Sequence, residues 1–252
     1  MIVAANWKMN LSLEAAGALA HGLAMRRLGS VRRLLFVPHP YVLPMSIRLQ
    51  ASDVRLGGQD CHQAESGAHT GDVSAMMLRD CGAVTVLLGH SERRSDHSES
   101  SALVAAKAAQ ALAHGLDIVV CIGETLAERQ AGVAEDVVIQ QLRDSLPTEM
   151  PAGKIIIAYE PVWAIGTGMV ASLDDIAAMQ QAIAKALPNS QNGSGEGAIP
   201  VLYGGSVKAD NVADIFALPH VSGGLVGGAS LELRAFDAIC DAAADITTVA
   251  GT

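Results

Sequence analysis

Short runs of apolar residues alternate along the chain with longer alanine-rich segments whose apolar positions recur at helical spacing. Each run is rich in β-branched residues, lacks apolar–polar alternation, and is followed by glycine, proline or polar residues. A strand that is buried on both faces has this pattern, which is typical of parallel sheets. The runs predict eight strands, at residues 2–5, 34–37, 54–56, 84–88, 117–122, 154–159, 200–203 and 224–226.

The segments between the runs predict helices, among them residues 12–28, 98–114, 127–146, 173–187 and 231–249. Ser12 and Ser172 are suitable N-caps with acidic residues in the first turn, and Pro188 ends one of these helices. Eight strand–helix units in 252 residues favour an α/β fold, a closed eight-stranded parallel (β/α)8 barrel. An open doubly wound sheet fits less well because it has fewer strands.

No linker divides the chain, so we expect residues 1–252 to form a single barrel domain. The widest gap between predicted strands contains residues 189–197, which are polar and rich in glycine. This segment follows a helix and precedes a strand, on the face of such barrels that serves stability. We therefore interpret this segment as a surface connection rather than as part of a functional site.

Composition and charge exclude several classes of protein. Half of the residues are apolar and only 17% are charged, which excludes disorder. The net charge of −9 disfavours a nucleic-acid partner. No unbroken apolar stretch of about 18 residues and no signal-peptide pattern is present, so we expect no membrane partner and a cytoplasmic location. The four cysteines form no CxxC pair, and we interpret the adjacent Cys61 and His62 as loop or core residues rather than metal ligands.

In a (β/α)8 barrel the chemistry lies where the strands end, and three predicted strand ends carry candidate groups. Asn6 and Lys8 follow the first strand and point the same way by alternation, and a lysine at the barrel mouth indicates an anion. His90 follows the fourth strand at the start of a helix, where the positive helix end favours a neutral imidazole. Glu160 ends the sixth strand, where partial desolvation raises its basicity.

Glycine-rich loops follow the last three predicted strands. Residues 161–171 have the composition of a lid, with a proline at entry, apolar residues in the middle and glycines at the tip. Their match to the dinucleotide pattern GxGxxA lacks the required placement directly after the strand. Glycine pairs at 204–205 and 227–228 expose backbone N–H groups at strand-to-helix turns, which predicts a phosphate site.

Seven blocks of the sequence, one after another along the chain, resemble the triosephosphate isomerase family, whose fold is the TIM barrel: residues 6–10, 67–71, 89–94, 121–124, 158–168, 203–207 and 225–231. The resemblance implies a glycolytic and gluconeogenic enzyme that interconverts dihydroxyacetone phosphate and D-glyceraldehyde 3-phosphate through an enediolate. The resemblance also implies that this enzyme needs no cofactor and no metal, and that it forms a homodimer in which the loop around Thr70 reaches into the neighbouring subunit.

The same resemblance implies roles for individual residues. Glu160 is the base and His90 the neutral electrophile on the carbonyl oxygen, while Lys8 and Asn6 stabilise the charge of the enediolate and phosphate. Backbone groups bind the phosphate, and Glu92 and Cys121 support the site from behind. The phosphate-binding positions are Gly166, Ser206, Gly227 and Gly228.

The sequence departs from the family pattern at four positions: Leu11 stands in place of a usual glycine, His69 in place of an aromatic residue, and Ala184 and Ser222 in place of an Arg and an Asp. Two other functions stay open. One is a different phosphate-binding barrel, such as an aldolase, although no lysine is well placed for a Schiff base. The other is a catalytically silent phosphate-binding barrel with an adhesion or binding role, although Lys8, His90 and Glu160 are all present.

Overall fold

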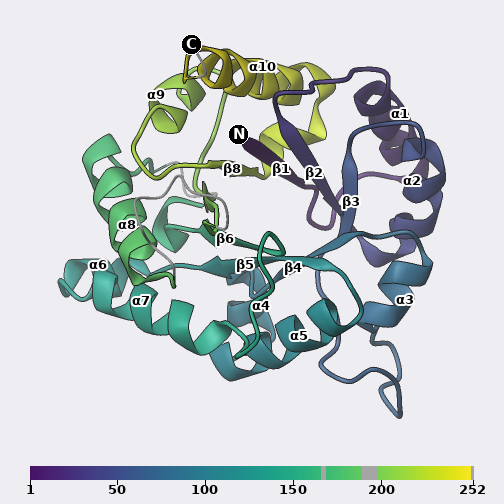
Figure 1. The fold of residues 1–252 in the computed structure, drawn as a ribbon, viewed down its shortest axis with the longest axis horizontal. Coiled ribbons are helices and arrows are strands. Elements are labelled where there is room, and N and C mark those ends of the chain that lie inside the picture. Colours follow the sequence, from purple (N-terminus) through teal and green to yellow (C-terminus); the bar gives the residue numbers. More distant parts are fainter. Residues whose placement is uncertain (166–168, 189–197, 251–252) are drawn as a thin grey trace.

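Eight parallel strands close into a barrel in sequence order, and helices surround it (Figure 1). The structure is a computed structural model, and it describes residues 1–165, 169–188 and 198–250. Each strand pairs with the next in parallel, and β8 pairs with β1, so the predicted eight-stranded barrel is confirmed. The strands are β1 (Ile2–Asn6), β2 (Arg32–Val37), β3 (Arg55–Gly58), β4 (Thr85–Leu88), β5 (Asp117–Ile122), β6 (Ile155–Tyr159), β7 (Val201–Tyr203) and β8 (Gly223–Val226).

The helices follow the strands in turn. They are α1 (Leu13–Ala24), α2 (Val42–Leu49), α3 (Ala75–Asp80), α4 (Ser91–Asp96), α5 (Ser101–Ala113), α6 (Leu126–Gln130), α7 (Ala134–Ser145), α8 (Leu173–Ala186), α9 (Val212–Phe216) and α10 (Leu233–Ala250), with 3₁₀ turns η1 (His39–Tyr41), η2 (Val162–Ala164) and η3 (Gly228–Leu231). Among the described residues, none of these helices has both the length and the apolar character needed to cross a bilayer.

The unalternating apolar strands are explained by two separate hydrophobic cores. Val3 and Ala5 of β1 belong to the larger core, which lies between the strands and the helices, whereas Ile2 and Ala4 belong to a smaller core of strand residues. Successive strand residues point to opposite faces, so both faces of β1 must be apolar. The smaller core fills the barrel with residues from most of the strands: Ile2, Ala4, Leu34, Phe36, Leu87, Val119, Cys121, Ile156, Ala158, Leu202 and Leu225.

The helix predicted over residues 127–146 is wrong as a single element. A capping box between Thr125 and Glu128 starts α6 one residue earlier, and α6 ends after one turn and a half. Gly132 then adopts a φ of +75°, a left-handed conformation that ends the helix, and α7 begins anew at Ala134. The helix predicted over 98–114 begins at Ser101 instead, because Ser100 is its N-cap.

The amino-terminal end of the barrel is closed by charged and polar contacts that the apolar pattern does not reveal. Asp117 at the start of β5 accepts from Arg32, Arg55 and Lys154 at 2.6–3.0 Å. Ser222 precedes β8 at this same end, and its hydroxyl accepts from the backbone N–H of Val201 at 3.3 Å. The residue that departs from the family at position 222 therefore bridges β7 and β8, far along the strand from the carboxyl-terminal loops.

Candidate active site

A cavity of about 550 Å³ opens at the carboxyl ends of the strands, where the sequence predicted the chemistry. The predicted groups Asn6, Lys8, His90 and Glu160 all line it, although they come from three different strand ends. A second cavity of about 600 Å³ shares three of these side chains and extends toward the loops that follow β1 and β3. The fold therefore brings together groups that are far apart in the sequence, such as Asn6 and Glu160, which are separated by 154 positions.

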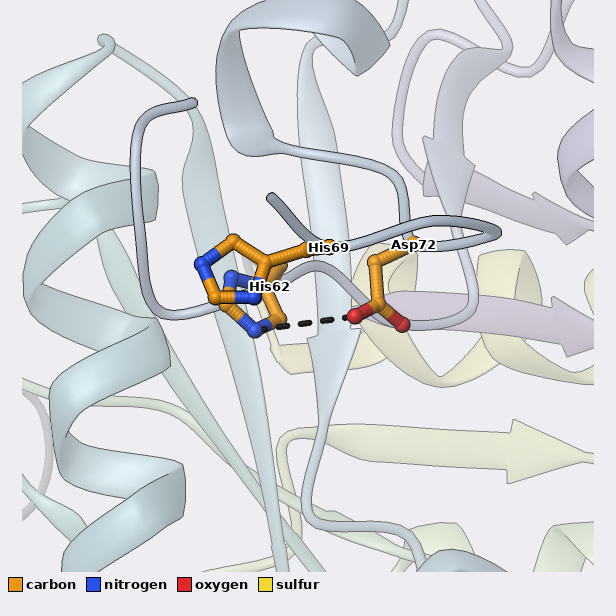
Figure 2. Close-up of side chains that lie close together, drawn as sticks. All are labelled: His62, His69 and Asp72. Carbon is orange, nitrogen blue, oxygen red and sulfur yellow. Dashed lines mark ion pairs between the residues drawn. The ribbon is translucent and has the colours of Figure 1, made fainter. Parts of the chain in front are cut away.

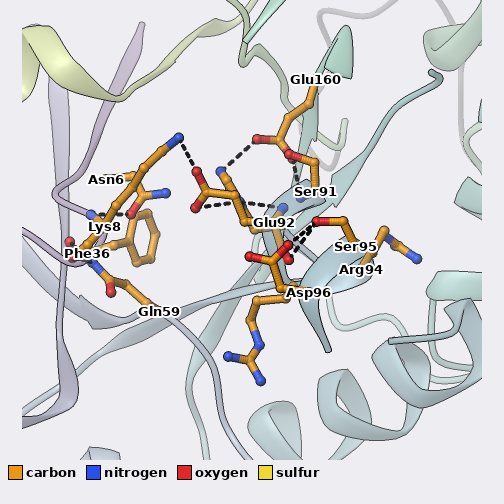
Figure 3. Close-up of polar contacts among 12 residues, drawn as sticks. Asn6, Lys8, Phe36, Gln59, Ser91, Glu92, Arg94, Ser95, Asp96 and Glu160 are labelled. Carbon is orange, nitrogen blue, oxygen red and sulfur yellow. Dashed lines mark hydrogen bonds and ion pairs between the residues drawn. The ribbon is translucent and has the colours of Figure 1, made fainter. Parts of the chain in front are cut away.

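Lys8 is held in an unusual backbone conformation at the end of β1. Its φ is +51°, the left-handed region that a non-glycine residue rarely adopts. The Lys8 N–H donates to the side chain of Asn6 at 3.0 Å, and Gln59 donates to the Lys8 carbonyl at 3.0 Å. These bonds fix the backbone so that the Lys8 Nζ reaches Glu92 Oε1 at 2.7 Å (Figure 3).

His90 is the N-cap of α4, and its ring nitrogens have different partners. Nδ1 accepts from the backbone N–H of Glu92 at 3.2 Å, so Nδ1 carries no proton and the neutral ring is protonated at Nε2. Nε2 lies 2.9 Å from Glu160 Oε1. Burial favours the uncharged ring, whereas the Glu160 carboxylate raises the pKa of His90 above its ordinary value. The Glu92 N–H favours an Nδ1 without a proton, and the neutral ring expected from the sequence stays a prediction.

Glu160 is 2% exposed and directly follows β6. Its Oε2 accepts from the backbone N–H of Ser91 at 3.0 Å, at the start of α4 (Figure 3). Burial by itself raises the pKa of Glu160, but His90, the Ser91 N–H and Lys8 outweigh it and lower the pKa below its usual value, so the raised basicity expected from the sequence is wrong. Glu160 is thus ionised at neutral pH, the protonation state that a general base requires.

Two glycines allow the chain to approach Glu160 closely. A Cβ at Gly123, after β5, would lie 1.7 Å from the Glu160 carbonyl oxygen, and a Cβ at Gly204, after β7, would lie 2.9 Å from Glu160 Cγ. Neither position can hold a side chain without displacing Glu160. The sequence reasoning assigned Gly204 to phosphate binding alone and missed this steric role.

The loops predicted to bind phosphate line the same cavity. Ser206 follows β7, and Gly227 and Gly228 follow β8 at the start of η3. The Ser230 hydroxyl donates to the Gly227 carbonyl at 2.7 Å, which fixes the turn. A Cβ at Gly227 would come no closer than 3.7 Å to Lys8 Cε, so this loop lies beside the ammonium-bearing side chain. Gly166, also predicted to bind phosphate, lies outside the described residues.

The entry to the predicted lid is anchored by a buried carboxylate. Glu124 is fully buried, and its Oε1 accepts from the Trp163 indole at 2.8 Å, from Arg129 at 2.9 Å and from Tyr159 at 3.2 Å. Its carbonyl also accepts from the Val162 N–H at 3.1 Å. These bonds tie the first residues of the segment to the end of β5. The glycines at 166 and 168, and with them the GxGxxA match, lie outside the described residues.

The two residues predicted to support the site take different places. Glu92 contacts Lys8 directly and is half-exposed in the second cavity. Cys121 is buried inside the barrel, where burial, and then the neighbouring Glu160 charge, hold the pKa of its thiol well above the usual value. The sequence reasoning missed Arg94, which donates to the carbonyls of Gly89 and Cys121 and so braces the turn that carries His90.

A closed (β/α)8 barrel that gathers a carboxylate, an imidazole and an ammonium group beside glycine-rich loops belongs to the class of barrel enzymes that act on phosphate-bearing substrates. The sequence model of the triosephosphate isomerase family matches residues 1–243, so the chain belongs to this family.

Similar proteins span nearly all of the chain. It is 50% identical to the triosephosphate isomerase of Acidiphilium cryptum, over 96% of this chain and 98% of the relative. It is 47% identical to that of Ruegeria pomeroyi, over 96% of each. The crystal structure of triosephosphate isomerase from Bartonella henselae is similar with a TM-score of 0.84 and 40% identity, and the match covers 96% of this chain and 98% of that one.

Proposed function

We propose that this chain interconverts dihydroxyacetone phosphate and D-glyceraldehyde 3-phosphate by moving one proton between neighbouring carbons through an enediolate. The observation that carries the proposal is the Glu160–His90 contact of 2.9 Å in a cavity that also holds Lys8 and the glycine-rich loops. A carboxylate base, a neutral hydrogen-bond donor and a cation are the groups that proton abstraction next to a carbonyl requires.

The proton transfer follows from the protonation states of the site. The Glu160 carboxylate leaves the Ser91 N–H and takes a proton from the carbon beside the carbonyl. The His90 Nε2–H donates to the carbonyl oxygen. The ring carries its proton on Nε2 because Nδ1 accepts from the Glu92 N–H. The Lys8 ammonium stabilises the negative charge that develops on the enediolate. His90 donates its Nε2 proton to the former carbonyl oxygen and takes up the hydroxyl proton of the neighbouring oxygen, so the ring ends neutral. Glu160 returns the carbon-bound proton to the neighbouring carbon, so the base is regenerated.

The phosphate group is held away from the reacting carbons. Backbone groups at Ser206, Gly227 and Gly228, with Gly166 from the lid, bind it, and Asn6 and Lys8 add polar contacts. Binding energy from this remote group favours closure of residues 161–171 over the substrate, which excludes water from the enediolate. No bound cofactor or metal takes part in these steps.

The same proposal includes a homodimer in the cytoplasm. Met9, next to Lys8, is 94% exposed, and the segment between β3 and α3, which carries Thr70, extends away from the barrel (Figure 1). Insertion of the Thr70 loop beside Met9 of a second copy would cover both, next to the active site.

A coupled assay on D-glyceraldehyde 3-phosphate tests the proposal. The wild-type chain is expected to turn over this substrate, and His90→Gln is expected to lower kcat about 10²-fold, because the flexible amide does not hold its donor where the imidazole Nε2–H lies. His97→Gln, at the other end of α4, is the matched control and is expected to keep kcat. Absence of turnover by a folded wild-type chain would favour the silent binding barrel instead.

A further inference from the structure

A pocket of about 330 Å³ opens at the amino-terminal end of the barrel, at the opposite end from the proposed active site. Residues that precede or begin β3, β4, β5 and β6 line it, together with one residue of α3. We call it the amino-terminal pocket. Its charged lining residues are Arg55 at the start of β3, Arg79 of α3, Asp117 at the start of β5 and Lys154 just before β6.

Positive charges around the amino-terminal pocket outnumber negative ones. The Asp117 carboxylate lies 2.6 Å from Arg55 Nη2 and 2.8 Å from Lys154 Nζ. Arg32 Nη2 lies 3.0 Å from the same carboxylate. With Arg79, the group holds four positive charges and one negative charge, in a chain whose net charge is −9. Burial, and then repulsion by Arg55, lower the pKa of Arg32 below its usual value, as an excess of positive charge predicts.

The loop before β5 fixes Arg79 at the edge of the pocket. Arg79 Nη1 donates to the His114 carbonyl at 2.5 Å. Gly115 makes room for this contact, because a Cβ at its position would lie 2.0 Å from Arg79 Nη1. The φ of Gly115 is +77°, which also favours glycine. The guanidinium is thus held in place before an anion arrives, so less side-chain entropy is lost on binding.

Arg55 and Lys154 keep donors beyond those that Asp117 accepts. An ammonium has three donors, and Lys154 gives one of them to Asp117. Arg55 gives Nη2 to Asp117, and its Nε is buried without an acceptor among the described residues. A buried donor without an acceptor is costly. Rotation of the Arg55 side chain, which is 39% exposed, brings this donor to a ligand in the pocket.

We propose that the amino-terminal pocket binds an anion with two or more linked phosphate groups, either an inorganic oligophosphate or the phosphate chain of a nucleotide. Guanidinium groups bind phosphate oxygens through paired N–H donors, and an ammonium adds a compact positive charge. Linked phosphates carry a charge that matches the excess of positive charge, whereas a single phosphate compensates only part of it. The Asp117 carboxylate repels an anion less than a free carboxylate does, because three cations already contact it.

The pocket is separate from the proposed subunit contact. His62, His69 and Asp72 form another polar cluster, with one atom of each within 4.8 Å of the others (Figure 2). This cluster lies in the segment between β3 and α3 that carries Thr70, which the proposed dimer covers, so we assign no ligand to it. No residue of that segment lines the amino-terminal pocket, and neither does Met9. An anion in the pocket therefore does not compete with that contact.

Calorimetric titration of the full-length protein with sodium tripolyphosphate, in a buffer free of phosphate and divalent cations, tests the proposal. The wild type is expected to show saturable binding. Arg79→Gln and Lys154→Met are each expected to weaken it about tenfold, the loss expected when one charge-assisted hydrogen bond is removed. Arg143→Gln, which removes an exposed arginine of α7 and changes the net charge equally, is the matched control and is expected to bind as the wild type does.

Three further titrations locate and identify the ligand. Lys8→Met alters the proposed active site and is expected to leave tripolyphosphate binding unchanged, so the result does not depend on the proposed isomerase activity. Orthophosphate is expected to bind at least tenfold more weakly than tripolyphosphate. Tighter binding of ATP would identify a nucleotide as the ligand, and equal or weaker binding of ATP an inorganic oligophosphate.

Four results would overturn the proposal. They are no saturable binding of tripolyphosphate or ATP by the wild type, equal binding by the wild type and both pocket variants, equal binding of orthophosphate and tripolyphosphate, and loss of binding in Lys8→Met alone.

Discussion

Replacing Lys107 with Met should destabilise the fold strongly, because this lysine joins two buried carboxylates. Lys107 is 4% exposed, and its Nζ donates to both oxygens of Asp60 at 2.9 and 2.8 Å and to Glu99 at 2.6 Å. Arg93 binds the same two carboxylates at 3.0 and 2.7 Å. The cluster holds two positive and two negative charges, so it is neutral as a whole.

The size of the effect follows from the charge that the substitution leaves behind. Lys107→Met leaves Asp60 and Glu99 to share the single charge of Arg93, so the cluster carries one uncompensated negative charge. Breaking a buried ion pair by removing one partner costs about 3–5 kcal/mol. We expect a loss near the lower end, about 3 kcal/mol, because Arg93 remains. A domain is stable by only about 5–15 kcal/mol, so this is a large share.

Urea unfolding at one fixed protein concentration measures this loss, since association also contributes to apparent stability. Lys154→Met is the matched control. Its Nζ is also 2.8 Å from a carboxylate, that of Asp117, but the lysine side chain is 46% exposed against 6% for Lys107. Asp117 also keeps Arg32 and Arg55.

The control is therefore expected to lose about 1 kcal/mol or less. Equal losses for the two variants, or a loss below about 1 kcal/mol for Lys107→Met, would refute the reasoning from burial.

Other predictions concern the base, the assembly and the dependence on pH. Glu160→Asp withdraws the carboxylate by about one methylene and should lower kcat about 10²-fold, whereas an unchanged kcat would remove Glu160 as the base. Light scattering should give a dimer mass at micromolar concentration, and a fully active monomer would contradict the role of Thr70. Burial raises the pKa of Glu99, but Lys107 and Arg93 lower it below its reference value of 4.5, so its stabilising contribution is complete above that pH and is lost as the pH falls. Acid unfolding of Lys107→Met should accordingly begin at higher pH than that of the wild type, and coincident acid transitions would contradict this assignment. Removal of metal with EDTA should leave isomerase activity unchanged, and a loss restored by Zn²⁺ would show that a metal serves the reaction.

The barrel could be predicted from the sequence because each strand is buried on both faces and therefore appears as a short apolar run without alternation. Residues 117–122 were predicted as a strand with the bounds that β5 has. The short helices were harder to foresee. Pro44 lies inside α2, which has only eight residues, and α4 has only six residues, all of them charged or polar. Helices this short give too little sequence for a pattern to be recognised.

Buried charged residues at strand starts were also missed by the sequence prediction. Arg32 and Arg33 begin β2, yet the apolar pattern started that strand at residue 34. Arg33 is 1% exposed because it donates to the Leu23 carbonyl and pairs with Asp53. Such burial depends on a partner 20 positions away, which local sequence does not reveal.

Individual residues of the candidate site could be predicted only where they directly follow a predicted strand. Asn6, Lys8, His90 and Glu160 each follow a predicted strand, so their convergence followed from the barrel itself. Arg94 and Gln59 act through backbone carbonyls that come near them only after folding.

Hydrogen exchange from solvent during turnover tests the central claim most directly. Dihydroxyacetone phosphate is incubated with the protein in D₂O, and the products are followed by proton NMR. The account predicts D-glyceraldehyde 3-phosphate that carries deuterium at C2, recovered dihydroxyacetone phosphate that carries deuterium at C1, and a loss of both with Glu160→Gln. Conversion and exchange that persist in a folded Glu160→Gln variant, or their absence in the wild type, would contradict proton transfer by Glu160.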